Sequence, residues 1–345
     1  MLELPTRGRN REASILAFAD ELQKIQSQID FKVSARGWCY QLEQLGLITK
    51  AEFGKVEGLI NKECRQKGYL PIDFVAEEES RKFSGIEIPN ESSPLEFIKS
   101  FLNDVLIAER YYTPDWWEGE DFYIQMVVEK IDLKSLFGPV CREYHIPIAT
   151  SKGWSSMLQR AEYAKRFKEA EDKGLKCVLL YCGDHDPDGL RISEFLRSNL
   201  DDLKYIHWGD GEEGYDPYDL EINRFGLNYD FIIANNLSWI NNLITGSGKN
   251  LASPSHPNHY MSYVQDYLAQ IGERKCEANA LVVAPAQGRL LCRQAIERYV
   301  GEGAIERFNN RWLVISKEIG KLREETGVKT SVEEAIRIID NGSKD

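Results

Sequence analysis

The chain has 345 residues and a formal net charge of −12, with 42% hydrophobic and 28% charged residues. This composition is typical of a globular protein with two or three domains, and it argues against a nucleic-acid binder with a generally basic surface. No apolar stretch approaches the roughly 20 residues needed to cross a bilayer, and the N-terminal residues lack the apolar core of a secretion signal. The seven cysteines form no CxxC pair, which favours reduced, buried thiols in a cytoplasmic protein over a disulfide framework.

The charge is distributed unevenly along the chain. Residues 1–70 contain 11 Lys and Arg against 9 Asp and Glu, a balance of +2, whereas the remaining 275 residues have a balance of −14. A polyanion would therefore meet a local basic patch or a site neutralised by metal.

The N-terminal residues predict a compact helical module. A helix is expected at 12–29, and two more at 34–45 and 50–67 are joined by a tight turn, GLIT. Gly68 follows, and YLPIDFV is typical of a short strand or wing. Two short helices joined tightly and followed by a β element predict a winged helix-turn-helix module over residues 1–75 that binds DNA.

The rest of the chain divides into three further parts. Residues 76–121 read as a polar linker followed by a helix. Residues 122–245 alternate between apolar strands (FYIQMVV, IPIAT, KCVLLYC and, further along, YDFIIANN) and helices. This alternation predicts an α/β domain with a mainly parallel sheet covered on both faces. After a polar loop, residues 246–345 predict a helical C-terminal extension.

Four carboxylates follow two of the expected strands. Glu129 ends the first strand, and Asp184, Asp186 and Asp188 follow the strand KCVLLYC, 55 residues later. Because ligands bind at the carboxyl ends of parallel strands, and because two βα units separate these ends, the four side chains can lie close together. A hard divalent cation would relieve their repulsion, and an all-oxygen set favours Mg²⁺ or Mn²⁺.

The acidic segment has two other interpretations. The first is a solvated acidic turn in which Asp184 caps the following helix, and it stays open. The second is a calcium-binding EF-hand, because D-x-D-x-D-G opens such a loop. The EF-hand is excluded because its twelfth position is Phe195 and because a strand precedes the segment.

Three motifs resemble a known family. VVEK (127–130), SKGW (151–154) and GDHDPDG (183–189) resemble the Toprim domain of type II topoisomerases, primases and related nucleases, and in particular the A subunit of topoisomerase VI and its meiotic double-strand-break relatives. The segment CEANALVVAPAQGRLLCRQAIERYV is also similar. The resemblance implies a Rossmann-like Toprim domain after the winged helix.

The resemblance also implies roles for single residues. Glu129, Asp184 and Asp186 would hold Mg²⁺, with Asp188 as a further acid. Such an ion would contact a phosphate oxygen of the nucleic-acid backbone. The motifs contain two more candidates, Lys130 and Lys152, which would contact phosphate or form salt bridges to the acids.

The helix at 34–45 carries a candidate nucleophile. At helical spacing, Trp38, Leu42 and Leu45 form an apolar stripe, and Tyr40 lies on the opposite face one turn from Arg36. A phenol beside a cation that steers phosphate suits nucleophilic attack. An exposed tyrosine packed against a neighbour is the alternative.

The family resemblance extends to this helix. Topoisomerase VI A subunits carry a catalytic tyrosine in a winged helix, and VSARGWCYQL is similar to their motif. Arg36 and Tyr40 match the arginine and the second tyrosine. Cys39 replaces the first tyrosine, however, and Gly37 replaces an acidic residue.

The helix at 50–67 has a basic face. Lys55, Lys62 and Arg65 cluster opposite an apolar stripe formed by Phe53, Val56, Ile60 and Cys64. Such a face suits contact with DNA phosphates, and a plain solvated helix surface is the alternative.

Together these features predict a Mg²⁺-dependent enzyme that cleaves DNA, with Tyr40, Arg36 and Glu129 as catalytic residues. The reaction would be transesterification by the tyrosine or hydrolysis, as in the nuclease subunit of Wadjet-type plasmid-defence systems. Cutting both strands needs two sites and therefore a homodimer. No Walker motif is present, so ATP-driven strand passage would need a separate ATPase subunit. The alternatives are a non-catalytic DNA-binding or scaffold protein with a Toprim fold and a nuclease that acts on RNA or in phage defence.

Overall fold

The computed structural model describes residues 4–5, 8, 10–76, 88–151, 157–206, 208, 213–244 and 248–342. The chain forms two compact units. The first comprises Met1–Glu77 and Glu120–Val300, and the second comprises Glu78–Gly119 and Gly301–Asp345. Within the described ranges, no helix is both long and apolar enough to cross a membrane.

Three helical segments form the N-terminal module. They are α1 (Arg11–Gln26), α2 (Ala35–Gln44) and a continuous helical stretch made of η1 (Lys50–Glu52), α3 (Phe53–Gly58) and η2 (Leu59–Arg65), which confirms the three expected helices. The stripe predicted on the third helix is buried, and so are Trp38 and Leu42, but Leu45 is 47% exposed, contrary to expectation. Leu45 lies just beyond the end of α2, so the helical periodicity no longer applies there.

The segment after Gly68 is where a wing was expected. Residues 69–75 contain no strand, and a single bridge joins Ser34 to Ala76. The N-terminal module therefore consists of three helical segments with a turn-rich continuation, and the winged helix-turn-helix assignment stays a prediction.

A parallel sheet lies at the centre of the second part of this unit. Its strands are β1 (Phe122–Val128), β2 (Ile148–Thr150), β3 (Lys176–Cys182) and β4 (Glu221–Gly226), in the order β2-β1-β3-β4. All three pairings are parallel. The expected α/β class with a parallel sheet is confirmed.

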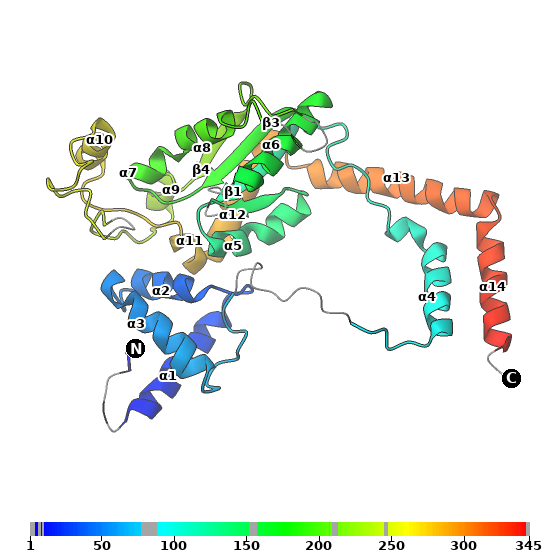
Figure 1. Cartoon of the computed structure of the whole chain (residues 1–345), viewed down its shortest axis with the longest axis horizontal. Coiled ribbons are helices and arrows are strands. Elements are labelled where there is room, and N and C mark those ends of the chain that lie inside the picture. The colour runs from blue at the N-terminus through cyan, green and yellow to red at the C-terminus, as the bar shows by residue number, and fades with distance from the viewer. Residues whose placement is uncertain are drawn as a thin grey trace. The chain divides into compact units, whose positions relative to one another are not determined.

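Helices cover both faces of the sheet (Figure 1). α5 (Ile131–Glu143) and α12 (Pro285–Val300) pack together on one face, and α6 (Met157–Asp172) and α8 (Ile192–Asp201) pack on the other. Because both faces are covered, six of the seven residues of β1 and of β3 are buried.

The prediction of a strand at YDFIIANN is wrong. This segment forms the helix α9 (Tyr229–Ala234), and the fourth strand lies upstream at β4. A short apolar run does not distinguish a strand from a helix by periodicity, and β4 itself is polar in sequence, EINRFG.

The remaining elements are helical. α7 (Pro187–Leu190), α10 (Ser262–Gln270) and α11 (Ala280–Val283) belong to the first unit. The second unit contains α4 (Pro94–Leu106), η4 (Ala108–Arg110), α13 (Ala304–Glu325) and α14 (Val328–Gly342). In the second unit α4 packs against α14, and Trp116 contacts Phe308 with 4.8 Å between ring centroids.

Candidate functional site

The carboxyl ends of β1 and β3 bring Glu129 and Asp184 into contact. The two strands are adjacent and parallel, with Val128 opposite Cys182. Glu129 follows β1 directly, and its Oε2 accepts a hydrogen bond from the backbone N–H of Asp184 at 2.7 Å. The sheet therefore holds the glutamate and the first aspartate of the predicted site side by side.

The other two aspartates have separate structural partners. Asp186 is the N-cap of α7, and its Oδ1 accepts a hydrogen bond from the N–H of Gly189 at 2.7 Å. The helix cap proposed for Asp184 is thus supplied by Asp186. Asp188 is exposed and accepts a hydrogen bond from the hydroxyl of Tyr263 at 3.0 Å.

Lys130 lies at the centre of the acidic cluster. Its Nζ donates to both carboxylate oxygens of Asp184, at 2.8 and 2.7 Å. The same atom is 3.9 Å from Oε1 of Glu129 and 3.5 Å from Oε2 of Glu277. The salt bridge to the acids, which is one of the two roles expected for this lysine, is formed.

The carboxylates still destabilise one another electrostatically. Burial and the nearby charge of Asp184 raise the pKa of Glu129 to about 8, and the same two causes raise the pKa of Asp186 to about 6. Bringing like charges together in a poorly solvated place disfavours their ionised forms. A cation of higher charge than an ammonium would oppose both shifts.

The donor set suits a hard divalent ion, but the side chains do not yet enclose one. Across the described parts of the chain, no three Asp, Glu, His or Cys side chains are arranged to hold a metal ion. Both oxygens of Asp184 instead accept hydrogen bonds from Lys130. Glu129, Asp184 and Asp186 offer only oxygen, which matches the preference of Mg²⁺ and Mn²⁺.

Glu277 is part of this site, and it was missed by the sequence-based prediction. Its segment runs beside the acidic turn, where Cys276 pairs with His185 and the N–H of Ala278 donates to Oδ1 of Asp184 at 2.7 Å. The Glu277 side chain is only 2% exposed. A single glutamate inside the apolar run CEANALVV was the available signal, because a buried carboxylate is costly unless it is paired.

Three lysines compensate the charge of Glu277. Lys275 Nζ lies 3.1 Å from Oε1 and Lys130 Nζ lies 3.5 Å from Oε2, while Lys50 donates a hydrogen bond to Oε1. Burial raises the pKa of Glu277, but the charges of these lysines outweigh it and lower the pKa to about 2. Glu277 is therefore an ionised group that holds three cations in place.

Tyr40 projects from α2 into this group of cations. Its ring packs edge-on against Phe53, with 5.1 Å between centroids. The Nζ of Lys130 lies 4.8 Å and that of Lys50 5.8 Å from the centre of the Tyr40 ring, and the Arg36 guanidinium is 5.9 Å away. Tyr40 was expected to lie opposite the core, but it is half-buried against the neighbouring part of the unit. Burial raises the pKa of its hydroxyl, and Lys130 opposes that rise.

Asp132, on α5, fixes the start of the tyrosine helix. Its carboxylate accepts hydrogen bonds from the backbone N–H of Ser34 at 2.8 Å and from the Ser34 hydroxyl at 3.3 Å. A Cβ atom on Gly37 would lie 2.0 Å from Oδ2 of Asp132. Glycine at position 37 thus makes room for an acid that arrives from another element. This contact gives a structural reason for the departure from the motif that the helix resembles.

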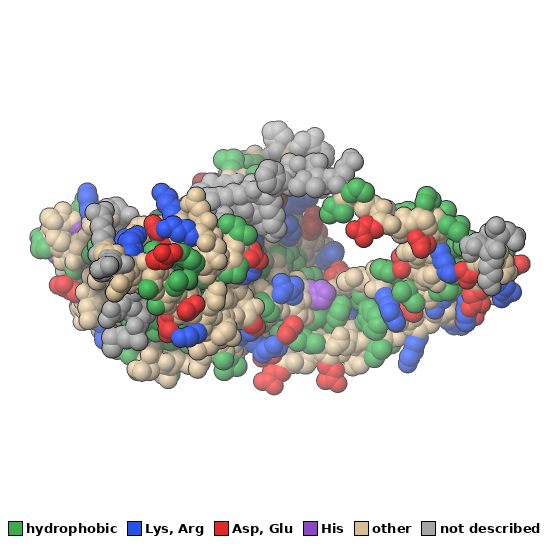
Figure 2. Space-filling view, turned by 90° about the horizontal axis from the view of Figure 1, so that it is seen from below, with side chains coloured by type: hydrophobic (Ala, Val, Ile, Leu, Met, Phe, Trp, Pro, Cys, Tyr) green, Lys and Arg blue, Asp and Glu red, His purple; other side chains and the backbone are tan. Residues whose placement is uncertain are grey.

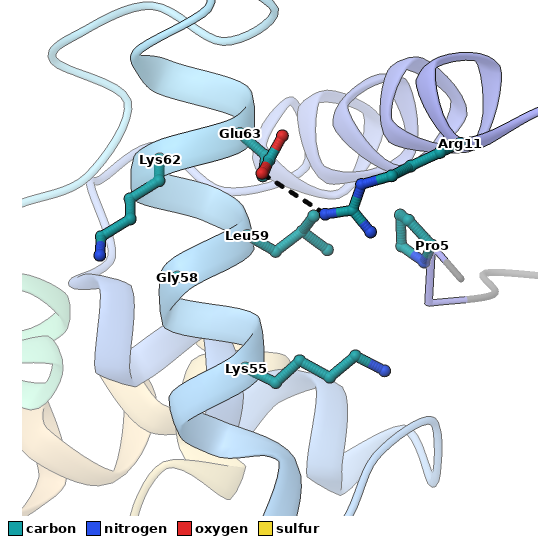
Figure 3. A pocket seen from close by; sticks show the side chains of 7 residues that line it. All are labelled: Pro5, Arg11, Lys55, Gly58, Leu59, Lys62 and Glu63. Atoms are coloured by element: carbon teal, nitrogen blue, oxygen red, sulfur yellow. Dashed lines mark ion pairs between the residues drawn. The ribbon is translucent and has the colours of Figure 1, made fainter. Parts of the chain in front are cut away.

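The residues predicted to bind DNA are distributed differently. Lys55 and Lys62 are exposed and line a shallow pocket with Arg11 and Leu59. Figure 3 shows the two lysines extending from the helix in different directions, while Arg11 reaches Glu63. Lysine and arginine are interspersed with acidic side chains on the face seen in Figure 2, so no continuous basic surface is visible there.

Two further basic candidates, the predicted DNA contact Arg65 and the predicted catalytic residue Arg36, have partners within the protein. Arg65 donates hydrogen bonds to the carbonyl of Ile72 at 2.8 Å and to Asn61 at 2.7 Å, which stabilises the turn after the helix. Arg36 forms an ion pair with Glu57 at 3.0 Å. Lys152 lies outside the described residues.

Comparisons with protein-family models, with curated proteins and with solved structures found no match for this chain. The resemblance to the topoisomerase VI A subunit therefore stays a prediction that rests on the quoted motifs.

Proposed function

We propose that this protein cleaves phosphodiester bonds of DNA with the help of Mg²⁺ or Mn²⁺. One observation carries the proposal. The Nζ of Lys130 contacts the carboxylate of Asp184 at 2.7 Å and lies 4.8 Å from the centre of the Tyr40 ring. Residues 40, 130 and 184 come from a helix, a strand end and a turn, yet one ammonium group links them. A nucleophile, a cation and an acid in contact are the parts that phosphoryl transfer requires.

Acids and cations of the site would have separate roles in cleavage. Glu129, Asp184 and Asp186 would hold the metal ion, which when bound supplies positive charge to a phosphate oxygen. Lys50 and Arg36 lie 5.8 and 5.9 Å from the centre of the Tyr40 ring and would orient the phosphate. Glu277 would keep Lys50 and Lys275 in place.

Transesterification by Tyr40 is the favoured chemistry. In this step the phenol oxygen bonds to phosphorus and loses its proton to solvent, while the bond to the leaving deoxyribose oxygen breaks and that oxygen takes up a proton. The cations around the ring favour the phenolate. Hydrolysis is the competing route, because burial of Tyr40 raises the pKa of its hydroxyl and so disfavours the nucleophilic form.

A second candidate function is DNA binding without cleavage. It is favoured by the occupation of both oxygens of Asp184 by Lys130. In either function we propose that the exposed Lys55 and Lys62 contact the DNA backbone. For cleavage of both strands we propose a homodimer, which light scattering of the purified protein would detect.

The test is incubation of the purified protein with supercoiled plasmid and Mg²⁺, followed by electrophoresis with and without protease. DNA ends linked to protein support tyrosine chemistry, and free ends formed only with metal support hydrolysis. Binding without cleavage would overturn the enzyme proposal in favour of the second candidate. Preferential cutting of labelled RNA would overturn the choice of DNA.

Two variants assign the residues in this assay. Tyr40→Phe should abolish the protein-linked ends, whereas the matched control Tyr69→Phe should keep them. Tyr69 belongs to the same helical module, but its hydroxyl donates to Glu12, away from the acidic cluster. Linked ends that persist in Tyr40→Phe would exclude Tyr40 as the nucleophile.

A further inference from the structure

The ammonium group of Lys130 is surrounded by acids. It donates to both oxygens of Asp184 and is within 4 Å of Glu129 and Glu277. The Lys130 side chain is only 16% exposed. A buried ammonium must be compensated by nearby negative charge, and a buried carboxylate must be compensated by a cation. In this site the lysine and Asp184 satisfy each other.

These oxygens are also the ones that a divalent ion would need. Asp184 lies between Glu129, whose Oε2 accepts from the Asp184 backbone, and the acidic turn that carries Asp186. An ion bound by all three acids would have to use an oxygen of Asp184 that now accepts from Lys130. An ammonium and a divalent ion cannot both occupy that position, because they would repel each other at contact distance.

We propose that Lys130 is an internal counter-ion which a divalent metal ion displaces from Asp184. This inference rests on the proposed metal-dependent function and adds a competition built into the same site. In the displaced state the ammonium moves toward the face of the Tyr40 ring, where the quadrupole of the ring attracts a cation. The Nζ is 4.8 Å from the ring centre before any displacement.

The neighbouring lysines show why this role belongs to Lys130. Lys275 is 4% exposed and pairs with Glu277, but it also donates to a backbone oxygen, the carbonyl of Ile244, at 2.7 Å, so it has an anchor for which a metal ion would not compete. Lys50 pairs with Glu277 and does not contact Asp184. The contacts of Lys130 Nζ with described residues are only with carboxylates and the Tyr40 ring.

The first experiment measures Mn²⁺ binding to the full chain by isothermal titration calorimetry. Lys130→Gln removes the competing charge and keeps a polar side chain, so we expect Mn²⁺ to bind at least about tenfold more tightly than to the wild type. Lys32→Gln is the matched control, because it also removes an ammonium from an aspartate, Asp73, but at an exposed position, and we expect less than about a threefold change. Unchanged or weaker Mn²⁺ binding to Lys130→Gln would overturn the inference.

The second experiment uses the wild type and is independent of whether the variant folds. Lysine amines are acylated briefly with and without saturating Mn²⁺, and the labelled peptides are quantified by mass spectrometry. We expect Lys130 to react at least about fivefold faster with Mn²⁺, because its ammonium leaves the carboxylates. Lys275 is the internal reference and should not change. A Lys130 reactivity that is unchanged or lower with Mn²⁺ contradicts the displacement.

The two proposals fail in distinguishable ways. If the wild type binds Mn²⁺ and cleaves DNA but either experiment on Lys130 gives the contrary result, only the displacement is wrong. If neither wild type nor variant binds Mn²⁺, the displacement and the metal dependence of the proposed function are both wrong.

Discussion

Two groups of lysines in the first unit have opposite environments, since one group is buried and paired with acids and the other is exposed. Lys130 and Lys275 are 16% and 4% exposed and are paired with carboxylates. Lys55 and Lys62 are exposed, and neither forms an ion pair with another described residue. Removing a charge from the first group leaves a partner buried and uncompensated, which is costly. Removing one from the second group changes only a solvated charge that salt already screens.

The largest expected effect is the loss of DNA cleavage when Asp184, the acid that holds Lys130, is replaced. Asp184→Asn keeps the shape of the side chain and an oxygen for the N–H of Ala278, but it removes the charge that Lys130 and a metal ion need. We expect plasmid cleavage to slow by about a thousandfold or more, measured as the rate of nicking in Mg²⁺. The matched control is Asp73→Asn, because Asp73 also pairs with a lysine, Lys32, but at an exposed position. Equal loss in both variants would show that burial of the pair is irrelevant.

The next effect is on stability. Glu277→Gln leaves Lys50, Lys130 and Lys275 without their shared acid. Breaking a buried ion pair in this way costs about 3–5 kcal/mol, which urea denaturation at pH 7 would measure. Asp73→Asn should lower the free energy of unfolding by less than about 1 kcal/mol. A cost for Glu277→Gln as small as that of the exposed control would contradict the comparison.

The contribution of Glu277 should also depend on pH. Its pKa is about 2 in the folded chain, below the value of about 4.3 expected when unfolded. A carboxyl with a lowered folded pKa stabilises the protein fully above its unfolded pKa and loses that effect as the pH falls toward its folded pKa. The stability difference between wild type and Glu277→Gln should therefore shrink between about pH 4.5 and pH 2. A difference that stays constant over this range would mean that folding does not lower the pKa of Glu277.

The sheet and the position of its acids could be predicted from the sequence because they depend on local patterns. KCVLLYC is an apolar strand, and Glu129 and Asp184 lie one and two residues after strand ends, so parallel pairing was enough to bring them together. The strand β4 was missed because EINRFG is polar. Its place in the sheet depends on its pairing with β3, which the sequence does not display.

The cations of the site could not be predicted in the same way. Lys50 and Lys275 meet at Glu277 from positions 225 residues apart, and no local pattern encodes such a contact. The contact of Asp132 with the start of α2 could likewise not be predicted, because Asp132 comes from a helix that follows β1. The sequence therefore predicted which residues carry negative charge at the sheet edge, but not what neutralises them.

Gly37 gives a smaller, geometric prediction about a buried acid. Gly37→Ala would bring a Cβ within 2.0 Å of the Asp132 carboxylate, which must then shift. We expect a loss of about 1–3 kcal/mol in the free energy of unfolding, together with slower cleavage because the helix that carries Tyr40 moves. Gly54→Ala is the matched control, since Gly54 lies in α3, a Cβ there would meet no described atom within 4 Å, and alanine favours helices. Equal destabilisation by both variants would show that Asp132 is not the constraint.

The smallest effect is expected from replacing the exposed lysines, and it concerns DNA binding, not stability or cleavage. Lys55→Gln and Lys62→Gln should each weaken duplex binding by a few-fold and lower the slope of log Kd against log salt by about 1. They should leave the free energy of unfolding within about 0.5 kcal/mol of the wild type. Fluorescence anisotropy over a NaCl series measures the slope. Lys67→Gln is the control, because Lys67 pairs with Glu63 at 2.6 Å in the same region and has less free charge to offer. If the slope is unchanged in Lys55→Gln and Lys62→Gln, the DNA backbone does not contact this face, and the attraction must come from the buried lysines at the site itself.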